Sequence, residues 1–164
     1  MSKNRIIGTG FTAPLHSWDI FSMYLNASAE EDKRQAELAF LIAYQKRHGW
    51  DINLERVLDR HYEALVLTDA RVRIEWVSDG FTRMTGYPRK EAIGQSPRML
   101  QGMNTTQSSR ERVRLKLYGQ HAFTEDIVNY RKSGEEYICR VEIHPIFGSS
   151  NHLCHFLALE EEVK

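Results

Sequence analysis

The sequence predicts an α+β protein in which a helical extension precedes an antiparallel sheet of five strands. Two observations support this prediction. Apolar residues recur at helical spacing as far as Glu63, and from Ala64 onward the apolar runs are short, extended in character and separated by turn residues. We therefore divide the 164 residues into an N-terminal helical extension, residues 1–61, and a sheet domain, residues 62–164.

Charge, cysteine content and hydropathy argue against several classes of protein. The 22 basic and 22 acidic residues cancel, so nothing in the composition favours binding to a nucleic acid. Cys139 and Cys154 lack the spacing of a zinc site or a disulfide scaffold and fit a reducing compartment. No apolar run approaches the roughly 20 residues that span a bilayer, and the first ten residues lack a signal-peptide core. We expect a soluble cytoplasmic protein without direct contact to nucleic acid or membrane.

The extension is expected to contain three helices. Pro14 suits the first turn of the first helix, and Ser28 with Glu31 resembles a capping box at the start of the second. Gly49 supplies a stop for the second helix, and the third leads directly into the sheet. The expected bounds are 14–26, 28–47 and 53–63.

The aromatic residues of these helices leave two interpretations open. They are of the types enriched at subunit interfaces: Trp18, Phe21, Tyr24, Phe40 and Tyr44. The helices either pack on the domain that they precede or form a dimer interface. Because they carry more apolar surface than one small sheet domain needs, we predict a homodimer to which they contribute.

The sheet domain begins with a hairpin and ends with three further strands. Asp69-Ala70-Arg71 forms the first turn, and Ser133-Gly134 is a good hairpin turn because glycine accepts positive φ. The expected strands are 64–68, 73–77, 123–130, 136–145 and 153–160. Between the second and third strands we expect helices at 78–84, 88–94 and 104–119.

Several of these segments together resemble PAS domains of the LOV type, the flavin-binding blue-light sensors. The segments are Leu-Thr-Asp at 67–69, Ile-Glu-Trp-Val-Ser at 74–78, Thr-Gly-Tyr at 85–87 and Gly94–Gly102. That last segment reads G-x-N-C-R-F-L-Q-G in the family. The resemblance covers about residues 62–163 and implies a PAS fold, with the first and last strands near the centre of the sheet and helices between 79 and 119 on one face.

The resemblance implies a site for a flavin nucleotide, FMN in this family. Arg98 and Arg114 match the two phosphate-binding arginines, whose guanidinium groups suit a bidentate grip on a phosphate. Gln101 matches the glutamine beside the ribityl chain. Asn129 matches the first of two asparagines at the pyrimidine edge of the flavin, where an amide offers both a donor and an acceptor. The alternative is that Arg98 and Arg114 are solvated or form ordinary ion pairs with Glu91 and Glu111.

Four positions depart from the family pattern. Ser96 replaces an asparagine, Cys139 the second asparagine at the pyrimidine edge, and Glu160 the glutamine that senses flavin N5. Pro97 stands at the position of the cysteine that bonds to photoexcited flavin. Since proline has no thiol, the resemblance implies a site that cannot form the cysteinyl adduct.

The function predicted from these features is that of a stand-alone sensory or signalling module that signals to another chain. It is expected to bind a flavin nucleotide or a similar flat ligand without forming the photoadduct. Two alternatives stay open: a ligand-free dimerisation or adaptor domain, and a flavoprotein that works by photoreduction. We expect no enzyme, because the sequence holds no phosphate loop, no nucleophile elbow and no zinc-protease motif. His144, His152 and His155 show no spacing that defines a metal site.

Overall fold

The computed structural model describes residues 16–164, which belong to two compact units, Met1–Glu37 and Leu38–Lys164. The predicted helix start at Pro14 lies outside the described residues. No helix in the described range is long and apolar enough to cross a membrane.

The first two predicted helices are one continuous helix, α1, from His16 to His48. The expected break at residues 26–28 is wrong, because the residues there are Asn, Ala and Ser, which cost a helix interior little compared with Gly or Pro. Glu31 does not close a capping box; its Oε1 accepts a hydrogen bond from Gln35 Nε2, one turn later, at 3.2 Å. The helix ends as predicted before Gly49, whose φ is +64°.

The third predicted helix is shorter than expected. Helix α2 covers only Leu54–Leu58, and its N-cap Asn53 accepts a hydrogen bond from the backbone N–H of Arg56 at 2.9 Å. The chain leaves the helical conformation here because Glu63 already pairs with the sheet: its N–H donates to the carbonyl of Glu160 at 2.8 Å. Residues 59–63 must therefore extend.

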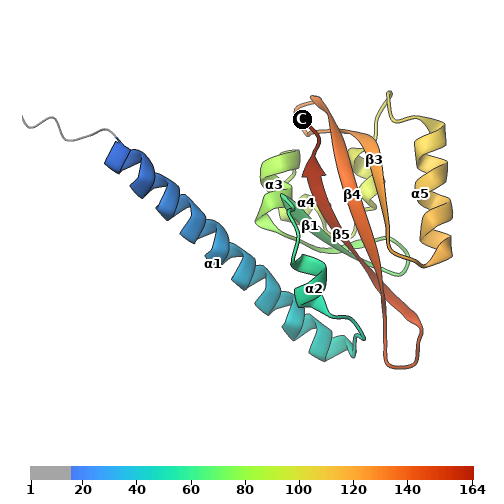
Figure 1. Ribbon diagram of the computed structural model, residues 1–164. Helices are drawn as coiled ribbons and strands as arrows, with labels where there is room; N and C mark the ends of the chain where they lie inside the picture. Colours follow the sequence, from blue (N-terminus) through green and yellow to red (C-terminus); the bar gives the residue numbers. More distant parts are fainter. Residues whose placement is uncertain (1–15) are drawn as a thin grey trace, which may run out of the picture. The chain divides into compact units, whose positions relative to one another are not determined.

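The sheet consists of the five predicted strands. Its strands are β1 (Ala64–Asp69), β2 (Ile74–Val77), β3 (Phe123–Tyr130), β4 (Glu136–Phe147) and β5 (Leu153–Glu162). They run antiparallel in the order β2-β1-β5-β4-β3, so the last strand is central and the first lies beside it, as expected (Figure 1). The long β4–β5 hairpin extends beyond the other strands.

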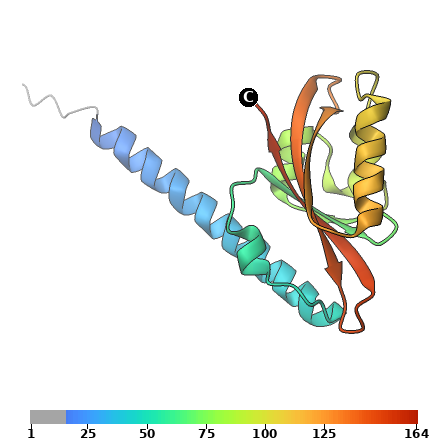
Figure 2. The same cartoon turned by 45° about the vertical axis from the view of Figure 1, so that its right-hand side comes forward.

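Short helices connect β2 to β3, again close to the predicted positions. They are α3 (Asp79–Thr85), α4 (Arg89–Ala92), the 3-10 helix η1 (Pro97–Leu100) and α5 (Gln107–Gly119). Helix α5 runs alongside the strands (Figure 2). Thr106 caps it by accepting a hydrogen bond from the N–H of Ser109 at 3.1 Å.

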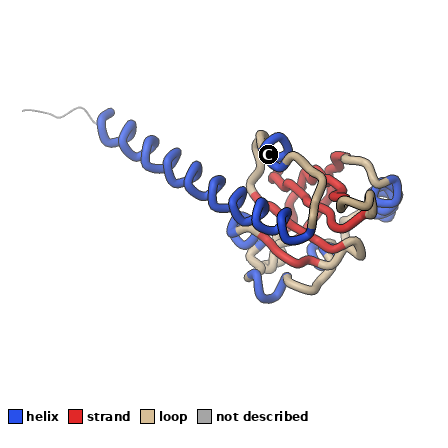
Figure 3. Tube along the Cα trace, turned by 90° about the horizontal axis from the view of Figure 1, so that it is seen from below, coloured by secondary structure: helices blue, strands red, loops and turns tan. Residues whose placement is uncertain are grey.

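Each face of the sheet carries its own core, and the strands are therefore covered on both sides (Figure 3). Alternate residues of β1 serve the two cores: Ala64 and Val66 pack with α3, α4 and η1, whereas Leu65 and Leu67 pack on the opposite face. On that opposite face Leu41 of α1 is fully buried together with Leu54 and Leu58 of α2. The prediction that helices between 79 and 119 cover one face is confirmed, and residues 38–62 cover the other.

Candidate ligand-binding site

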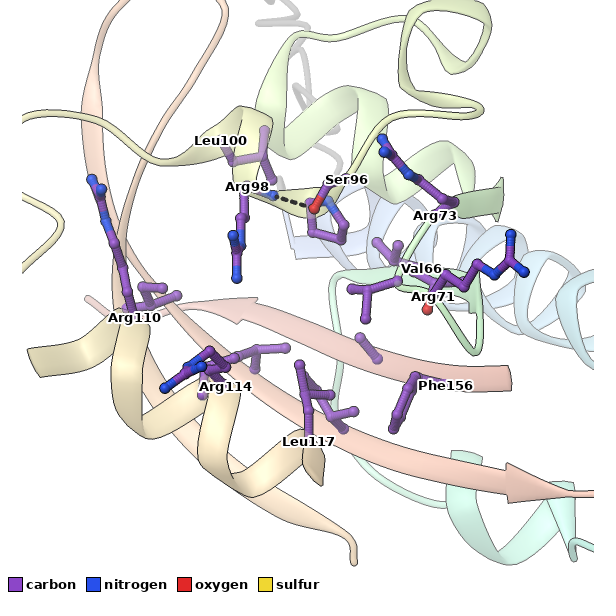
Figure 4. Close-up of a pocket in the computed structure, with 18 of the residues that line it drawn as sticks. Val66, Arg71, Arg73, Ser96, Arg98, Leu100, Arg110, Arg114, Leu117 and Phe156 are labelled. Atoms are coloured by element: carbon purple, nitrogen blue, oxygen red, sulfur yellow. Dashed lines mark hydrogen bonds between the residues drawn. The ribbon is translucent and has the colours of Figure 1, made fainter. Parts of the chain in front are cut away.

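A cavity of about 630 Å³ opens on the sheet face that carries η1 and α5 (Figure 4). This volume lies within the roughly 300–1,000 Å³ typical of small-molecule sites. The cavity is bounded by the sheet, by η1, by α5 and by the β1–β2 turn. Seven of the eight residues carried over from the family line it: Ser96, Pro97, Arg98, Gln101, Arg114, Asn129 and Glu160.

The sheet supplies a mostly apolar floor. Because side chains alternate along a strand, Phe156, Ala158 and Glu160 of β5 face the cavity while the residues between them face the other core. Val141 of β4, opposite Glu160 in the register, and Ile127 of β3 extend the apolar surface. A flat apolar ligand can lie on such a floor.

Helix η1 forms the roof of the cavity. The Oγ of Ser96 accepts a hydrogen bond from the Arg98 N–H at 3.4 Å and so caps the turn, while Pro97 occupies its first position, where a missing N–H costs nothing. Leu100 is buried and also lines the cavity, and Gln101 ends the turn beside it. The local sequence thus places Pro97 against the cavity.

Arg98 from η1 and Arg114 from α5 approach the same side of the cavity, as the resemblance implies. Arg114 pairs with Glu111, which was the alternative foreseen for it. Arg98 does not pair with Glu91, because Lys132 holds that carboxylate at 2.8 Å. Within the described residues no ion pair to Arg98 is formed.

Three further arginines line the cavity and were missed by sequence reasoning: Arg71, Arg73 and Arg110. Arg110 Nη2 donates to the carbonyl of Gly102 at 2.9 Å. Arg71 and Arg73 lie on the β1–β2 turn, whose backbone N–H groups at both positions bond to Asp69 Oδ1 at 2.9 and 2.8 Å. The Thr-Asp sequence signalled that turn, but nothing in the sequence placed it beside η1. Among the described residues that line the cavity, Glu160 is the only acidic one, and it is accompanied by five arginines.

The inner end of the cavity holds buried polar groups. Asn129 is 6% exposed and Glu160 is 5% exposed, and the Oε2 atom of Glu160 has no hydrogen-bond partner among the described residues. Burial raises the pKa of Glu160 to about 7, because the carboxylate loses the water that would stabilise its charge. Near neutral pH this carboxyl group is therefore protonated in a substantial share of the molecules.

Cys139 does not line the cavity, although it was carried over as a contact. Its side chain is fully buried in the core beside the cavity, two positions along β4 from Val141. Burial raises the pKa of its thiol well above the usual value, and the charge of Glu160 adds to the increase. Cys139 is thus a neutral core residue, and Val141 takes the place on the cavity wall.

Comparison with known proteins agrees with this geometry. The family model for the PAS domain matches residues 63–163. A blue-light-activated histidine kinase of Rhizobium johnstonii is 32% identical over 95 residues, which are 56% of this chain and 28% of that protein. A nitrogen fixation regulatory protein of Klebsiella oxytoca is 28% identical over 100 residues, 61% of this chain and 20% of that protein. This chain therefore spans less than a third of the length of either relative.

Solved structures show the same fold. A light-oxygen-voltage domain described in connection with a flavin analogue superposes with a TM-score of 0.63 at 27% identity, covering 70% of this chain and 87% of that chain. The family match spans the five strands and the helices between them, which are the elements that build the cavity. The chain belongs to the PAS domain family and has homologues among light-oxygen-voltage domains.

Proposed function

We propose that this PAS domain is a sensory or signalling module that binds a flavin nucleotide, FMN, and cannot form a cysteinyl photoadduct. The observation that carries the proposal is the cavity itself. It combines a basic opening with an inner end where a buried carboxyl oxygen has no partner. Buried polar atoms in native proteins are nearly always paired, so an unpaired one at a cavity wall suggests a missing ligand.

The opening of the cavity fits the phosphate end of the nucleotide. Arg98 and Arg114 come from two different elements and can grip a phosphate from two directions. Arg114 would exchange Glu111 for the phosphate, which is a small loss because both partners of that ion pair are solvent-exposed. Gln101 lines the same cavity and would lie beside the ribityl chain.

The inner end fits the ring only when Glu160 is protonated. A flavin edge presents carbonyl oxygens and an N–H group, and the amide of Asn129 can bond to either kind. A protonated Glu160 can donate to a ring nitrogen or oxygen, whereas the carboxylate can only accept and repels carbonyl oxygens. The pKa near 7 makes the neutral form available under ordinary conditions.

The cavity offers no thiol to a flavin. Pro97 lies where the family places the reactive cysteine, Cys139 is enclosed in the adjoining core, and Cys154 packs with the core of the opposite sheet face. A bound flavin supplies light absorption and electron transfer. In this chain its response is then limited to photoreduction or to a change in the hydrogen bonds of Asn129 and Glu160.

The test is to purify the full chain from cells, record its absorption spectrum, and titrate the flavin-free protein with FMN. We expect either a visible flavin band or saturable quenching of FMN fluorescence, and no species with the spectrum of a cysteinyl adduct under blue light. Absence of binding at every pH tested would leave the ligand-free adaptor as the function. Reversible bleaching with the spectrum of a cysteinyl adduct would refute the proposal that the photoadduct cannot form.

Signalling is proposed to involve a homodimer and a further protein. Ile20, Met23 and Tyr24 of α1 are 68–70% exposed and follow helical spacing, which is unusual for apolar residues without a partner. Changing Ile20 and Tyr24 to serine should turn a dimer into a monomer in light scattering. If the unchanged chain is already monomeric at high concentration, the homodimer is refuted.

A further inference from the structure

A second network of buried polar groups lies on the sheet face opposite the cavity, where the end of α1 meets β5. Trp50 and His155 are only 5% and 6% exposed. The indole N–H of Trp50 donates to His155 Nδ1 at 3.0 Å, and His155 Nε2 lies 3.1 Å from Glu75 Oε2. Tyr44 of α1 donates its hydroxyl to the same carboxylate oxygen at 2.7 Å. The network therefore joins α1, the segment after it, β2 and β5.

The donors and acceptors of this network fix the protonation state of His155. An indole N–H can only donate, so His155 Nδ1 must be an unprotonated acceptor. The ring proton then lies on Nε2 and is donated to the carboxylate of Glu75. A second proton on Nδ1 would point at the Trp50 N–H, and the buried indole would lose its only acceptor in the network.

The surroundings of His155 also favour its neutral form. Burial lowers the pKa of His155, the negative charge of Glu75 opposes this, and the neighbouring His48 lowers the pKa further. His48 lies on α1 with its ring centroid 5.0 Å from that of His155, and Asp69 lies opposite His155 on β1. The titratable groups that face the imidazole are thus Tyr44, His48, Asp69 and Glu75.

Trp50 is the residue through which this network holds the backbone after α1. It forms a bridge with Gly148 at the end of the β4–β5 hairpin, and the next residue, Asp51, donates its N–H to the carbonyl of Phe147 at 2.8 Å. The side chain of Gln45 on α1 donates to the carbonyls of Trp50 and Ile52 at 3.3 and 2.7 Å. The Trp50–His155 bond therefore connects β5 to a segment whose backbone is also joined to α1 and to the β4–β5 hairpin.

The same strand also serves the cavity. His155 precedes Phe156, and the two side chains point to opposite faces of β5, one to α1 and the other to the cavity floor. A change at His155 is thus placed to alter how α1 is held without touching the ligand site.

From this geometry we infer that His155, held between Trp50 and Glu75, is a proton-sensitive latch. It fixes residues 38–52 on the sheet while its imidazole is neutral and releases them when Nδ1 takes up a proton. The inference does not depend on flavin binding. It assigns to β5 a second role, which is control of the end of α1 by pH.

The test is hydrogen exchange of the full chain at pH 7.5 and pH 5.5, corrected for the intrinsic pH dependence of exchange. Protection of residues 38–52 should fall on acidification, by at most about tenfold per pH unit for one proton, while that of β3 should not change. His155→Gln keeps a donor and an acceptor but cannot titrate. In this variant the protection of residues 38–52 should therefore not depend on pH. The matched control, His144→Gln, should behave as the unchanged chain does.

A second measurement holds even if His155→Gln does not fold. Nitrogen chemical shifts of the unchanged chain at pH 7.5 should show His155 as the Nε2–H tautomer, with a titration that coincides with the loss of protection at residues 38–52. The Nδ1–H tautomer, protection that does not respond to acid, or a response that persists in His155→Gln would each overturn the latch.

Discussion

The two faces of the sheet each bury one titratable side chain of β5, and the structure treats these two side chains in opposite ways. Glu160 faces the cavity, and its Oε2 has no partner among the described residues. His155 faces α1, and both of its ring nitrogens are paired. An unpaired buried group is costly, whereas a fully paired one stabilises a joint between elements.

Burial favours the neutral form of both residues, but their effects on stability have opposite pH dependence. Glu160 has its pKa raised to about 7 from 4.5, so the stability that it contributes is complete below pH 4.5 and is lost as pH rises through 7. His155 has its pKa lowered from 6.5, so its contribution is complete above pH 6.5 and is lost as pH falls through the lowered value. The contribution of the cavity face thus falls as pH rises from 4.5 to 7, and that of the α1 face falls in acid.

The largest expected effect is on ligand binding, which should depend on residues of the cavity face alone. Replacing Arg98 and Arg114 by alanine should weaken FMN binding at least a hundredfold, because each charge-assisted contact is worth roughly tenfold or more in affinity. Riboflavin, which lacks the phosphate, should bind the variant and the unchanged chain alike. Isothermal titration of both ligands measures this.

The control for this variant is Arg83→Ala, which removes an exposed arginine of α3 outside the cavity. It should leave FMN affinity unchanged. Equal losses in the control and in the double variant would mean that the arginines act through general charge rather than as a phosphate site.

The next effect concerns stability of the ligand-free chain. Between pH 5 and pH 9 the free energy of unfolding should fall by on the order of 3 kcal/mol through Glu160 alone, at about 1.4 kcal/mol per unit of pKa shift. Glu160→Gln should remove this slope, which lies between pH 4.5 and pH 7, as measured by urea unfolding. A variant with the same slope as the unchanged chain would show that other groups cause it.

Glu160 also predicts the pH dependence of binding. FMN should bind about tenfold more weakly at pH 8 than at pH 5.5, since one unit above its pKa only about a tenth of the molecules carry the proton. In Glu160→Gln the two affinities should agree. Tighter binding of the unchanged chain at pH 8 would rule out the proposed role of the protonated carboxyl.

The smallest effect tests the opposite face. Trp50→Phe removes the donor to His155 and should lower the free energy of unfolding at pH 7.5 by roughly 1–3 kcal/mol, the usual cost of leaving a buried group unpaired. FMN affinity should not change. Trp76→Phe is the matched control, because Trp76 stacks on Phe40 with a centroid distance of 4.7 Å and is not part of the His155 network.

Local pattern explains what could be predicted before the structure. Strand bounds were correct to within two residues because alternation and the turn at Gly134, with φ of +90°, are local signals. The break predicted at Ser28 failed because a good capping residue does not end a helix that has no other reason to stop. The grouping of four residues at one cavity could be predicted only from the family resemblance, which supplied a fold. The residues are Arg98, Arg114, Asn129 and Glu160, and their spacing in the sequence does not indicate that they meet.

By itself the sequence determined the order and type of the elements, the absence of a thiol at Pro97, and the choice of a carboxyl group at position 160. Only the tertiary structure decided that Cys139 is enclosed in the core, that Arg71 and Arg73 line the cavity, and that His155 meets Trp50, which lies 105 positions away in the chain. The physical reason is that covalent order and hydrogen-bonding capacity belong to each residue. Burial and pairing depend on which distant segments the fold brings against it.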